Sequence, residues 1–177
     1  MENPYSMALP ALEHPMKRLL PFALGLALFG ALFQSAPAQA GPTSDNPFGL
    51  GLELDGALWP GFIGGLSVSG KYWMDRVNAV DMNLGGDNGG ISLGATYLWH
   101  NYSVFRRRDI PLYYGVGGYA NVGGSYLGMG ARAKIGVDWL FFHTPWEAFV
   151  EASPSLNLIG GLGFGVGLEG GARYYFF

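Results

Sequence analysis

The segment 162–176 alternates without interruption between apolar residues and residues that are small or charged. One face begins at Leu162 and ends at the aromatic residue Phe176, whereas the other is mostly glycine with Glu169 and Arg173 as charged members. A period of two predicts a β-strand with one apolar face. Because the opposite face is small or charged, we expect hydrocarbon rather than the protein's own core to cover the apolar face.

Seven earlier segments also have strand character, so the chain carries eight expected strands. They span residues 48–57, 64–73, 79–84, 91–100, 112–121, 127–141, 146–153 and 163–176. Turn-forming residues separate them, most clearly at 85–90 and 143–145. Spans of about ten residues suit strands that cross a bilayer at a tilt. The pattern predicts an all-β fold, namely an eight-stranded antiparallel up-and-down transmembrane β-barrel.

Nearly every charge within these strands falls on the face opposite the apolar residues. We expect these side chains to point into the lumen, because eight strands leave an interior just wide enough for side chains to fill. Buried charges must be paired, so we predict a closed lumen in which Arg132 and Lys134 pair with Glu147 and Glu151. The predicted lumen salt-bridge network comprises Glu53, Asp55, Lys71, Asp81, Arg132, Lys134, Asp138, Glu147, Glu151, Glu169 and Arg173.

The same sorting of faces would also fit a soluble barrel with an apolar core. The placement of the aromatic residues favours a membrane barrel instead. In an up-and-down barrel, the starts of odd strands and the ends of even strands share one rim. Aromatic residues gather at this rim on the apolar face, as in the girdle of a membrane interface. A soluble barrel does not explain that placement. The residues predicted for the interface are Tyr72, Trp73, Tyr97, Trp99, Trp139, Trp146, Tyr174 and Phe176.

The N-terminal region has the pattern of a secretory signal peptide. A basic segment, Met16-Lys17-Arg18, precedes an apolar run over 19–32, and Ala38-Gln39-Ala40 supplies a small-x-small cleavage site. We therefore predict a signal peptide over 1–40 and a barrel domain over 41–177, exported to the bacterial outer membrane. Residues 1–15 add nothing that a signal needs, so we hypothesise that translation starts at Met16.

Composition narrows the chemistry. The chain has no cysteine, which excludes disulfides, thiolate metal sites and thiol catalysis. Charged residues make up 13% and aromatic residues 15% of the chain, an unusual balance for a soluble domain. A net charge of -3 gives no argument for a nucleic-acid partner. With neither metal-ligand spacings nor a nucleotide-binding loop in the sequence, we expect no cofactor and no metal.

The sequence offers only one weak candidate for a catalytic site. His100 and Ser103 loosely resemble the nucleophile-activating pair of outer-membrane lipid A deacylases. A spacing of three at a strand end places them on opposite faces or in a turn, whereas an acyl hydrolase needs them within hydrogen-bond reach. We therefore predict a non-enzymatic barrel, with lipid A or phospholipid acyl chemistry as the alternative and a narrow channel as a further one.

One connection stands out by its charge. Arg106, Arg107 and Arg108 are consecutive in the segment 102–109, which links two expected strands on the predicted periplasmic side. Three adjacent arginines can engage anionic head groups or a periplasmic partner. The alternative is an ordinary solvated turn.

Five segments together carry a resemblance to known proteins, namely Gly70-Lys71-Tyr72-Trp73, Asn78-Ala79-Val80-Asp81, Tyr97-Leu98-Trp99-His100-Asn101, Pro111-Leu112-Tyr113-Tyr114-Gly115 and Gly171-Ala172-Arg173-Tyr174-Tyr175-Phe176. They resemble an uncharacterised family of small secreted bacterial outer-membrane barrel proteins. The architecture is also similar to that of the OmpA transmembrane domain and of OmpX-like barrels, whose roles are structural, adhesive or protective. The resemblance implies a monomer that contacts outer-membrane lipids and, during biogenesis, the barrel-assembly machinery. The last strand, which ends in an aromatic residue, resembles the signal that this machinery recognises. Similar chains end at the position of Phe176, and Phe177 departs from that pattern.

Overall fold

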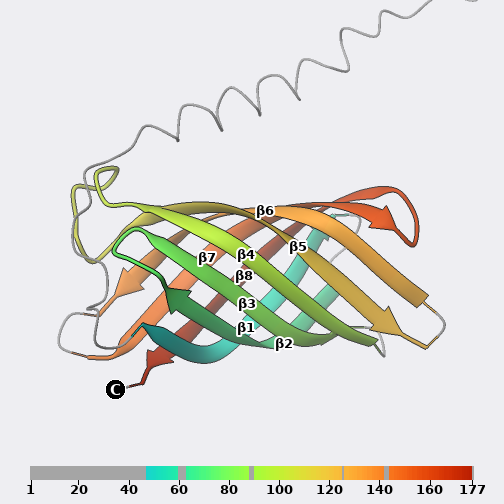
Figure 1. Ribbon diagram of the computed structural model, residues 1–177, viewed down its shortest axis with the longest axis horizontal. Coiled ribbons are helices and arrows are strands. Elements are labelled where there is room, and N and C mark those ends of the chain that lie inside the picture. The colour runs from blue at the N-terminus through green and yellow to red at the C-terminus, as the bar shows by residue number, and fades with distance from the viewer. Residues whose placement is uncertain (1–46, 60–62, 88–89, 125, 142–143, 177) are drawn as a thin grey trace, which may run out of the picture. The chain divides into compact units, whose positions relative to one another are not determined.

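The computed structural model describes residues 47–59, 63–87, 90–124, 126–141 and 144–176, and within them it contains eight β-strands (Figure 1). No helix in this part of the chain is long and apolar enough to cross a membrane. The strands are β1 (Phe48–Trp59), β2 (Ile63–Trp73), β3 (Asn78–Asp87), β4 (Gly90–Asn101), β5 (Leu112–Gly123), β6 (Tyr126–Leu140), β7 (Trp146–Ile159) and β8 (Gly163–Tyr175).

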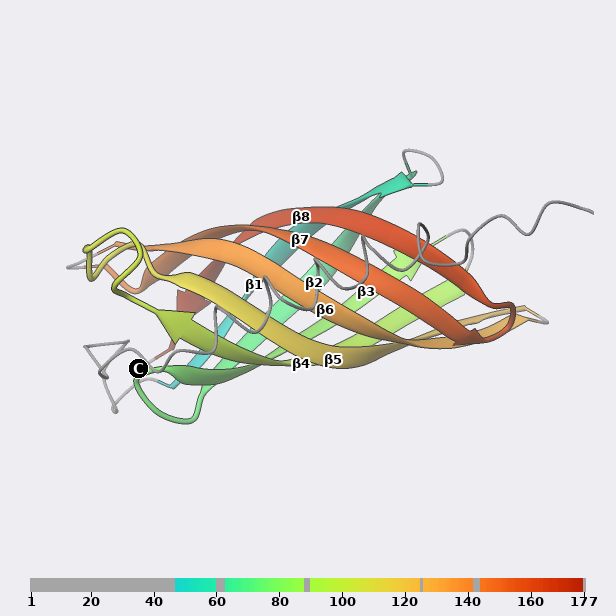
Figure 2. The same ribbon diagram turned by 90° about the horizontal axis from the view of Figure 1, so that it is seen from above.

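Each strand pairs antiparallel with the next, and β8 pairs antiparallel with β1, so the sheet closes into a barrel (Figures 1 and 2). The closing seam runs from Gly49 opposite Tyr175 to Trp59 opposite Val166, with one irregularity between Ala57 and Trp59. Closure leaves no strand edge unpaired, which is what a sheet surrounded by hydrocarbon requires. The predicted fold class is confirmed.

Most strands extend slightly beyond their predicted bounds, and β7 and β3 exceed them most. β7 continues through Pro154 to Ile159, six residues beyond the expected end. Proline has no N–H to donate to a neighbouring strand. The pairing of β6 with β7 is interrupted between Ser155, which is opposite Arg132, and Ala152, which is opposite Ile135. Pro154 lies in this interruption and pairs with Val166 of β8. The proline therefore lies where one ladder is interrupted rather than at the end of the strand.

The glycine-rich segment predicted as a turn over 85–90 is mostly strand. Gly85 and Gly86 of β3 pair with Ser92 and Ile91 of β4, so β3 extends to Asp87. The described residues do not include 88 and 89 of this predicted turn, or 143 of the turn predicted over 143–145. The predicted signal peptide over 1–40 and Phe177 also lie outside them. Between β7 and β8, Gly160 and Gly161 have φ angles of 89° and 125°, a backbone conformation that glycine adopts without strain.

Side chains alternate strictly between the outside and the inside of the barrel. Leu52, Leu54 and Leu66 on the outside are 57%, 67% and 58% exposed, whereas Glu53 between the first two is fully buried. Every charged strand residue whose side chain is described faces inward, and the outward positions of the described strands carry no charge. The barrel therefore inverts the usual arrangement, with ions inside and apolar residues outside.

The two ends of the barrel differ. We call the end where odd strands begin and even strands end the terminal rim, because Pro47 and Phe176 lie there. It also carries the connections 74–77 and 102–111. The opposite end, where odd strands end, is called the hairpin rim.

Candidate functional site

The middle of the lumen is crossed by ion pairs between strands that are distant in the sequence. Lys71 of β2 places its Nζ 2.5 Å from Asp138 Oδ2 of β6 and 3.2 Å from Glu147 Oε1 of β7. All three side chains have no exposed surface. These residues lie at inward positions of their strands, so closure of the barrel brings them together across the lumen.

Arg173 of β8 forms the second centre of the network. Its Nη1 donates to Glu147 Oε1 at 2.7 Å and its Nη2 to Asp81 Oδ1 at 2.6 Å. Nε and Nη2 also donate to Ser69 Oγ at 2.9 and 2.8 Å. The guanidinium lies 3.7 Å from the ring centroid of Phe149. A buried guanidinium needs such a full set of acceptors, because an unpaired one costs several kcal/mol.

Lys134 of β6 is the third centre. Its Nζ donates to Asp81 Oδ2 at 2.7 Å and to Glu151 Oε1, and it lies 3.1 Å from Glu169 Oε2. The expected pair of Lys134 with Glu151 is therefore present, whereas Glu147 pairs with Lys71 and Arg173 instead.

Arg132 differs from the prediction. Its Nε donates to Thr96 Oγ1 at 2.9 Å and its Nη2 to Asn83 Oδ1 at 3.0 Å, and both acceptors are neutral. The predicted pairs with Glu147 and Glu151 do not form among the described residues, because neighbouring strands fix which residues are opposite but not how far a long side chain reaches. Asp55 likewise accepts a hydrogen bond from Ser67 Oγ, at 2.8 Å, and not from a base.

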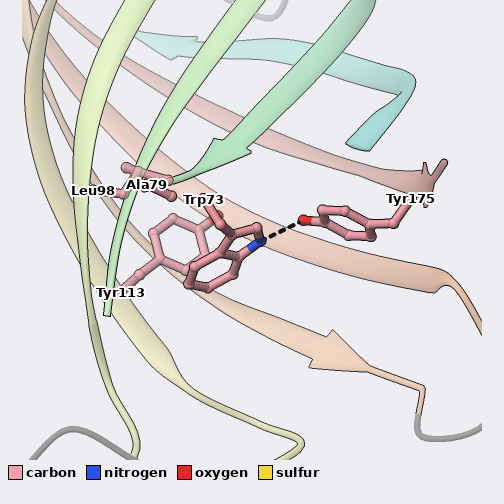
Figure 3. Close-up of a cluster of buried hydrophobic side chains, with 5 residues drawn as sticks. All are labelled: Trp73, Ala79, Leu98, Tyr113 and Tyr175. Atoms are coloured by element: carbon pink, nitrogen blue, oxygen red, sulfur yellow. Dashed lines mark hydrogen bonds between the residues drawn. The ribbon is translucent and has the colours of Figure 1, made fainter. Parts of the chain in front are cut away.

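An aromatic floor closes the lumen at the terminal rim (Figure 3). Trp73 Nε1 donates to Tyr175 Oη at 2.9 Å, and Tyr113 packs nearby with its hydroxyl donating to Glu151 Oε2 at 2.5 Å. Trp73 is 4% exposed, so its predicted place at the membrane interface is wrong. The physical reason is alternation: Tyr72 faces outward, and the next residue of a strand must therefore face inward.

His100 belongs to this floor. Its ring lies between Trp73 and Tyr113, at centroid distances of 4.2 and 5.4 Å. Nδ1 is 3.1 Å from Val77 O, and Nε2 is 3.1 Å from Asp138 Oδ2. The side chain has no exposed surface, so it does not lie on the outer face of the barrel.

The hydroxyl of Ser103 forms its hydrogen bond with Asn101. Its Oγ donates to Asn101 Oδ1 at 2.6 Å, in an exposed position of the β4–β5 connection. The two residues that resembled a nucleophile and its base thus have different partners in different environments.

The other predicted interface aromatics lie on the outward face near the terminal rim. Trp99 stacks on Tyr114 of β5 at 5.9 Å between ring centroids, and Tyr97 contacts Trp99 at 4.6 Å. Tyr174 contacts both Trp146 and Phe176, at 5.2 and 5.4 Å. Tyr72 and Trp139 are 44% and 39% exposed. These rings form a band around the barrel at one height.

The connection 102–111 presents a mixed apolar and basic surface. Val104 and Phe105 are 48% and 47% exposed, and the three arginines after them are also exposed. Arg107 donates from Nε and Nη2 to Asp109 at 3.0 and 2.5 Å, and these hydrogen bonds hold the pKa of Asp109 below its usual value. Tyr102 anchors the connection from its buried end, and burial raises the pKa of its phenol.

The hairpin-rim half of the lumen contains a cavity of about 360 Å³. It is lined mainly by serine, asparagine and glycine, with Asp55, Arg132 and Glu169 as its charged residues. Sequence reasoning missed this cavity and the aromatic floor. The parity of Trp73, Tyr113 and Tyr175 already places them on the inward face, and that signal could have identified the floor.

The comparisons with known proteins address the fold. No protein-family model and no curated protein matches the chain. Among solved structures, the barrel is similar to Neisserial surface protein A, an outer-membrane β-barrel, with a TM-score of 0.53 and 18% identity over 73% of this chain and 97% of that one. The N-terminal β-barrel domain of Pseudomonas aeruginosa OprF gives a TM-score of 0.49 and 15% identity over 71% and 97%. At this identity, the likeness to the neisserial protein shows a shared fold.

Proposed function

We propose that the protein is a bacterial outer-membrane barrel with a side-chain-filled lumen, exported by its signal peptide and serving a structural or interaction role. The observation that carries the proposal is the distribution of charge. The described outward strand positions carry no charge, while Lys71, Arg173 and Lys134 are held inside by carboxylates. Exposed leucines over a closed barrel are favourable in hydrocarbon and costly in water.

The dimensions support the same proposal. The strands are 10 to 15 residues long, and a strand of twelve residues tilted by 45° rises about 28 Å. This height matches the apolar band of an outer-membrane barrel. The aromatic band at the terminal rim then lies at the periplasmic interface, and β8 with Phe176 presents the aromatic-ended strand that the assembly machinery reads.

The geometry gives the enzymatic alternative little support. An acyl hydrolase acting on lipid needs a base and nucleophile that reach the bilayer. His100 is instead enclosed between two lumen aromatics and bonded to Val77 and Asp138. Mass spectrometry of lipid A and phospholipids, with and without the gene, tests this alternative, and a mass shift that depends on the gene would favour the enzyme.

Spin labels test the membrane proposal directly. The chain has no cysteine, so single cysteines introduced at Leu168 and Ser155 label one outward and one inward position of neighbouring strands. We expect oxygen dissolved in the bilayer to relax the label at 168 and not the label at 155. Unboiled protein from the outer-membrane fraction should also migrate differently from boiled protein. Recovery of the chain in the soluble periplasmic fraction, or the reverse labelling pattern, would overturn the proposal.

A further inference from the structure

Three carboxylates cluster beside the cavity in the hairpin-rim half of the lumen, and two of them, Asp55 and Glu169, line it. Glu53 and Asp55 come from β1 and Glu169 from β8, and one oxygen of each lies within 4.8 Å of the other two. Asp55 and Glu169 are direct cross-strand partners in the closing seam. Like charges in directly opposite positions destabilise a strand pair, so this arrangement requires a positive charge nearby.

Two bases of the lumen, Lys134 and Arg173, are already engaged by several acceptors, whereas Arg132 lines the cavity and donates to the neutral Thr96 and Asn83. Lys134 lies 3.1 Å from Glu169 Oε2, but the same ammonium also bonds Asp81 and Glu151. Arg173 Nη2 is 3.9 Å from Glu53 Oε2, outside hydrogen-bond distance, and donates instead to Asp81 and Ser69. The ammonium and the guanidinium are therefore shared among carboxylates that lie deeper in the lumen.

One carboxylate oxygen of Glu53 is left without a hydrogen-bond donor among the described residues. Its side chain is fully buried, yet Oε2 accepts no hydrogen bond from the described residues. Oε1 accepts one long bond, 3.4 Å, from Asn83 Nδ2, while Asn83 Oδ1 is held by Arg132. A buried carboxylate oxygen without a donor is costly, and Glu53 is one of the three clustered carboxylates.

Among the described side chains of the lumen, positive charge is likewise in deficit. Seven described carboxylates face inward against four lysine and arginine side chains, an excess of three negative charges that protonation of His100 would reduce only to two. The carboxylates are Glu53, Asp55, Asp81, Asp138, Glu147, Glu151 and Glu169, and the bases are Lys71, Arg132, Lys134 and Arg173.

We propose that Glu53, Asp55 and Glu169 bind a divalent cation of the Ca²⁺ class inside the barrel. Ca²⁺ prefers oxygen ligands at 2.3–2.6 Å, so two oxygens on opposite sides of one ion are about 4.8 Å apart, and the three carboxylate oxygens fit within that span. Ser67 Oγ donates to Asp55 and Ser153 Oγ to Glu169. Such outer hydrogen bonds orient carboxylate ligands, and the cavity leaves room for water to complete the coordination.

Calcium binding to the full chain is the test. The protein is refolded from denaturant into zwitterionic detergent, without lipopolysaccharide, and treated with EDTA that is then removed. Titration calorimetry with CaCl₂ should show one ion per barrel, with a Kd in the range of about 10⁻⁴–10⁻³ M seen for extracellular Ca²⁺ modules. Tb³⁺ luminescence sensitised by Tyr119, which lines the cavity, provides a second readout. Ca²⁺ should also raise the unfolding temperature.

Two variants locate the ion. Asp55→Asn and Glu53→Gln should each weaken Ca²⁺ binding by at least about tenfold, whereas Asp109→Asn, in the connection 102–111, should leave it unchanged. Heat-modifiable migration shows that each variant is folded, and if one fails to fold the other carries the test. A folded wild-type barrel without saturable binding at about ten times the upper limit of that Kd range, or folded Asp55 and Glu53 variants with unchanged affinity, would overturn the proposal.

Discussion

Two adjacent glycines of β5 show how tightly single residues are constrained inside the barrel. A Cβ at Gly117, which faces the lumen, would lie 2.1 Å from Ala95 O and 2.6 Å from Thr96 Cα. At Gly118, which faces outward, the nearest atom would be Gly130 O at 3.4 Å. We expect Gly117→Ala to lower the free energy of unfolding by about 1–3 kcal/mol and Gly118→Ala to change it by less than about 0.5 kcal/mol. Urea unfolding of the refolded variants in detergent checks this, and equal losses would contradict it.

Lys134 is the residue whose removal should cost most, because one ammonium serves Asp81, Glu151 and Glu169. Lys134→Met keeps the volume and deprives Glu151 and Glu169 of their basic partner in a closed space, while Asp81 keeps Arg173. The expected loss in the free energy of unfolding is about 3–5 kcal/mol, measured in EDTA so that no bound cation offsets it. Arg108→Met removes an exposed charge and should leave the unfolding curve unchanged. Equal effects of the two variants would show that the lumen is solvated.

At the scale of elements, the connection 102–111 is the segment most suited to contact lipid head groups. Val104 and Phe105 are half exposed beside the arginines, and Arg107 is already paired with Asp109. We therefore expect the double variant Arg106→Gln, Arg108→Gln to lose roughly tenfold in its selectivity for anionic over zwitterionic lipid, and Arg107→Gln to lose less. Spin-labelled phosphatidylglycerol and phosphatidylcholine measure this selectivity in vesicles. Unchanged selectivity in the double variant would make the connection an ordinary solvated turn.

The elements also show what the sequence could predict and what it could not. A period of two is a local property, so it correctly predicted eight strands and placed Glu53 inside and Leu54 outside. Trp73 departs from its predicted place because the alternation along β2, and not nearness to the strand end, decides which way its side chain faces. Contacts across the lumen, such as Lys71 with Asp138, depend on barrel tilt and side-chain reach, and no local pattern contains them. The cluster of Glu53 with Glu169 forms only because the first and last strands meet.

At the scale of the whole molecule, the network and the aromatic floor divide the lumen into a polar cavity at the hairpin rim and a closed section below it. Lys71, Asp138 and Glu147 have no exposed surface, and Arg173 is 1% exposed. An ion passing through would have to separate pairs that each cost several kcal/mol to break. The hairpin-rim cavity, with Asp55 at its wall, is therefore a blind pocket that an ion enters and leaves by the same opening.

A conductance measurement tests this closure. We expect the refolded barrel in planar bilayers to show no steady single-channel current, because its buried ion pairs are beyond the reach of screening by the bathing salt. A general porin added to the same bilayer is the positive control, and heat-modifiable migration of the sample shows that the barrels are folded. Weakening the plug with Arg173→Ala, which leaves Glu147 with Lys71 and Asp81 with Lys134 as basic partners, should produce small currents if that variant folds. Large, steady currents from the unmodified protein would mean that the network opens in a membrane and that the narrow-channel alternative is correct.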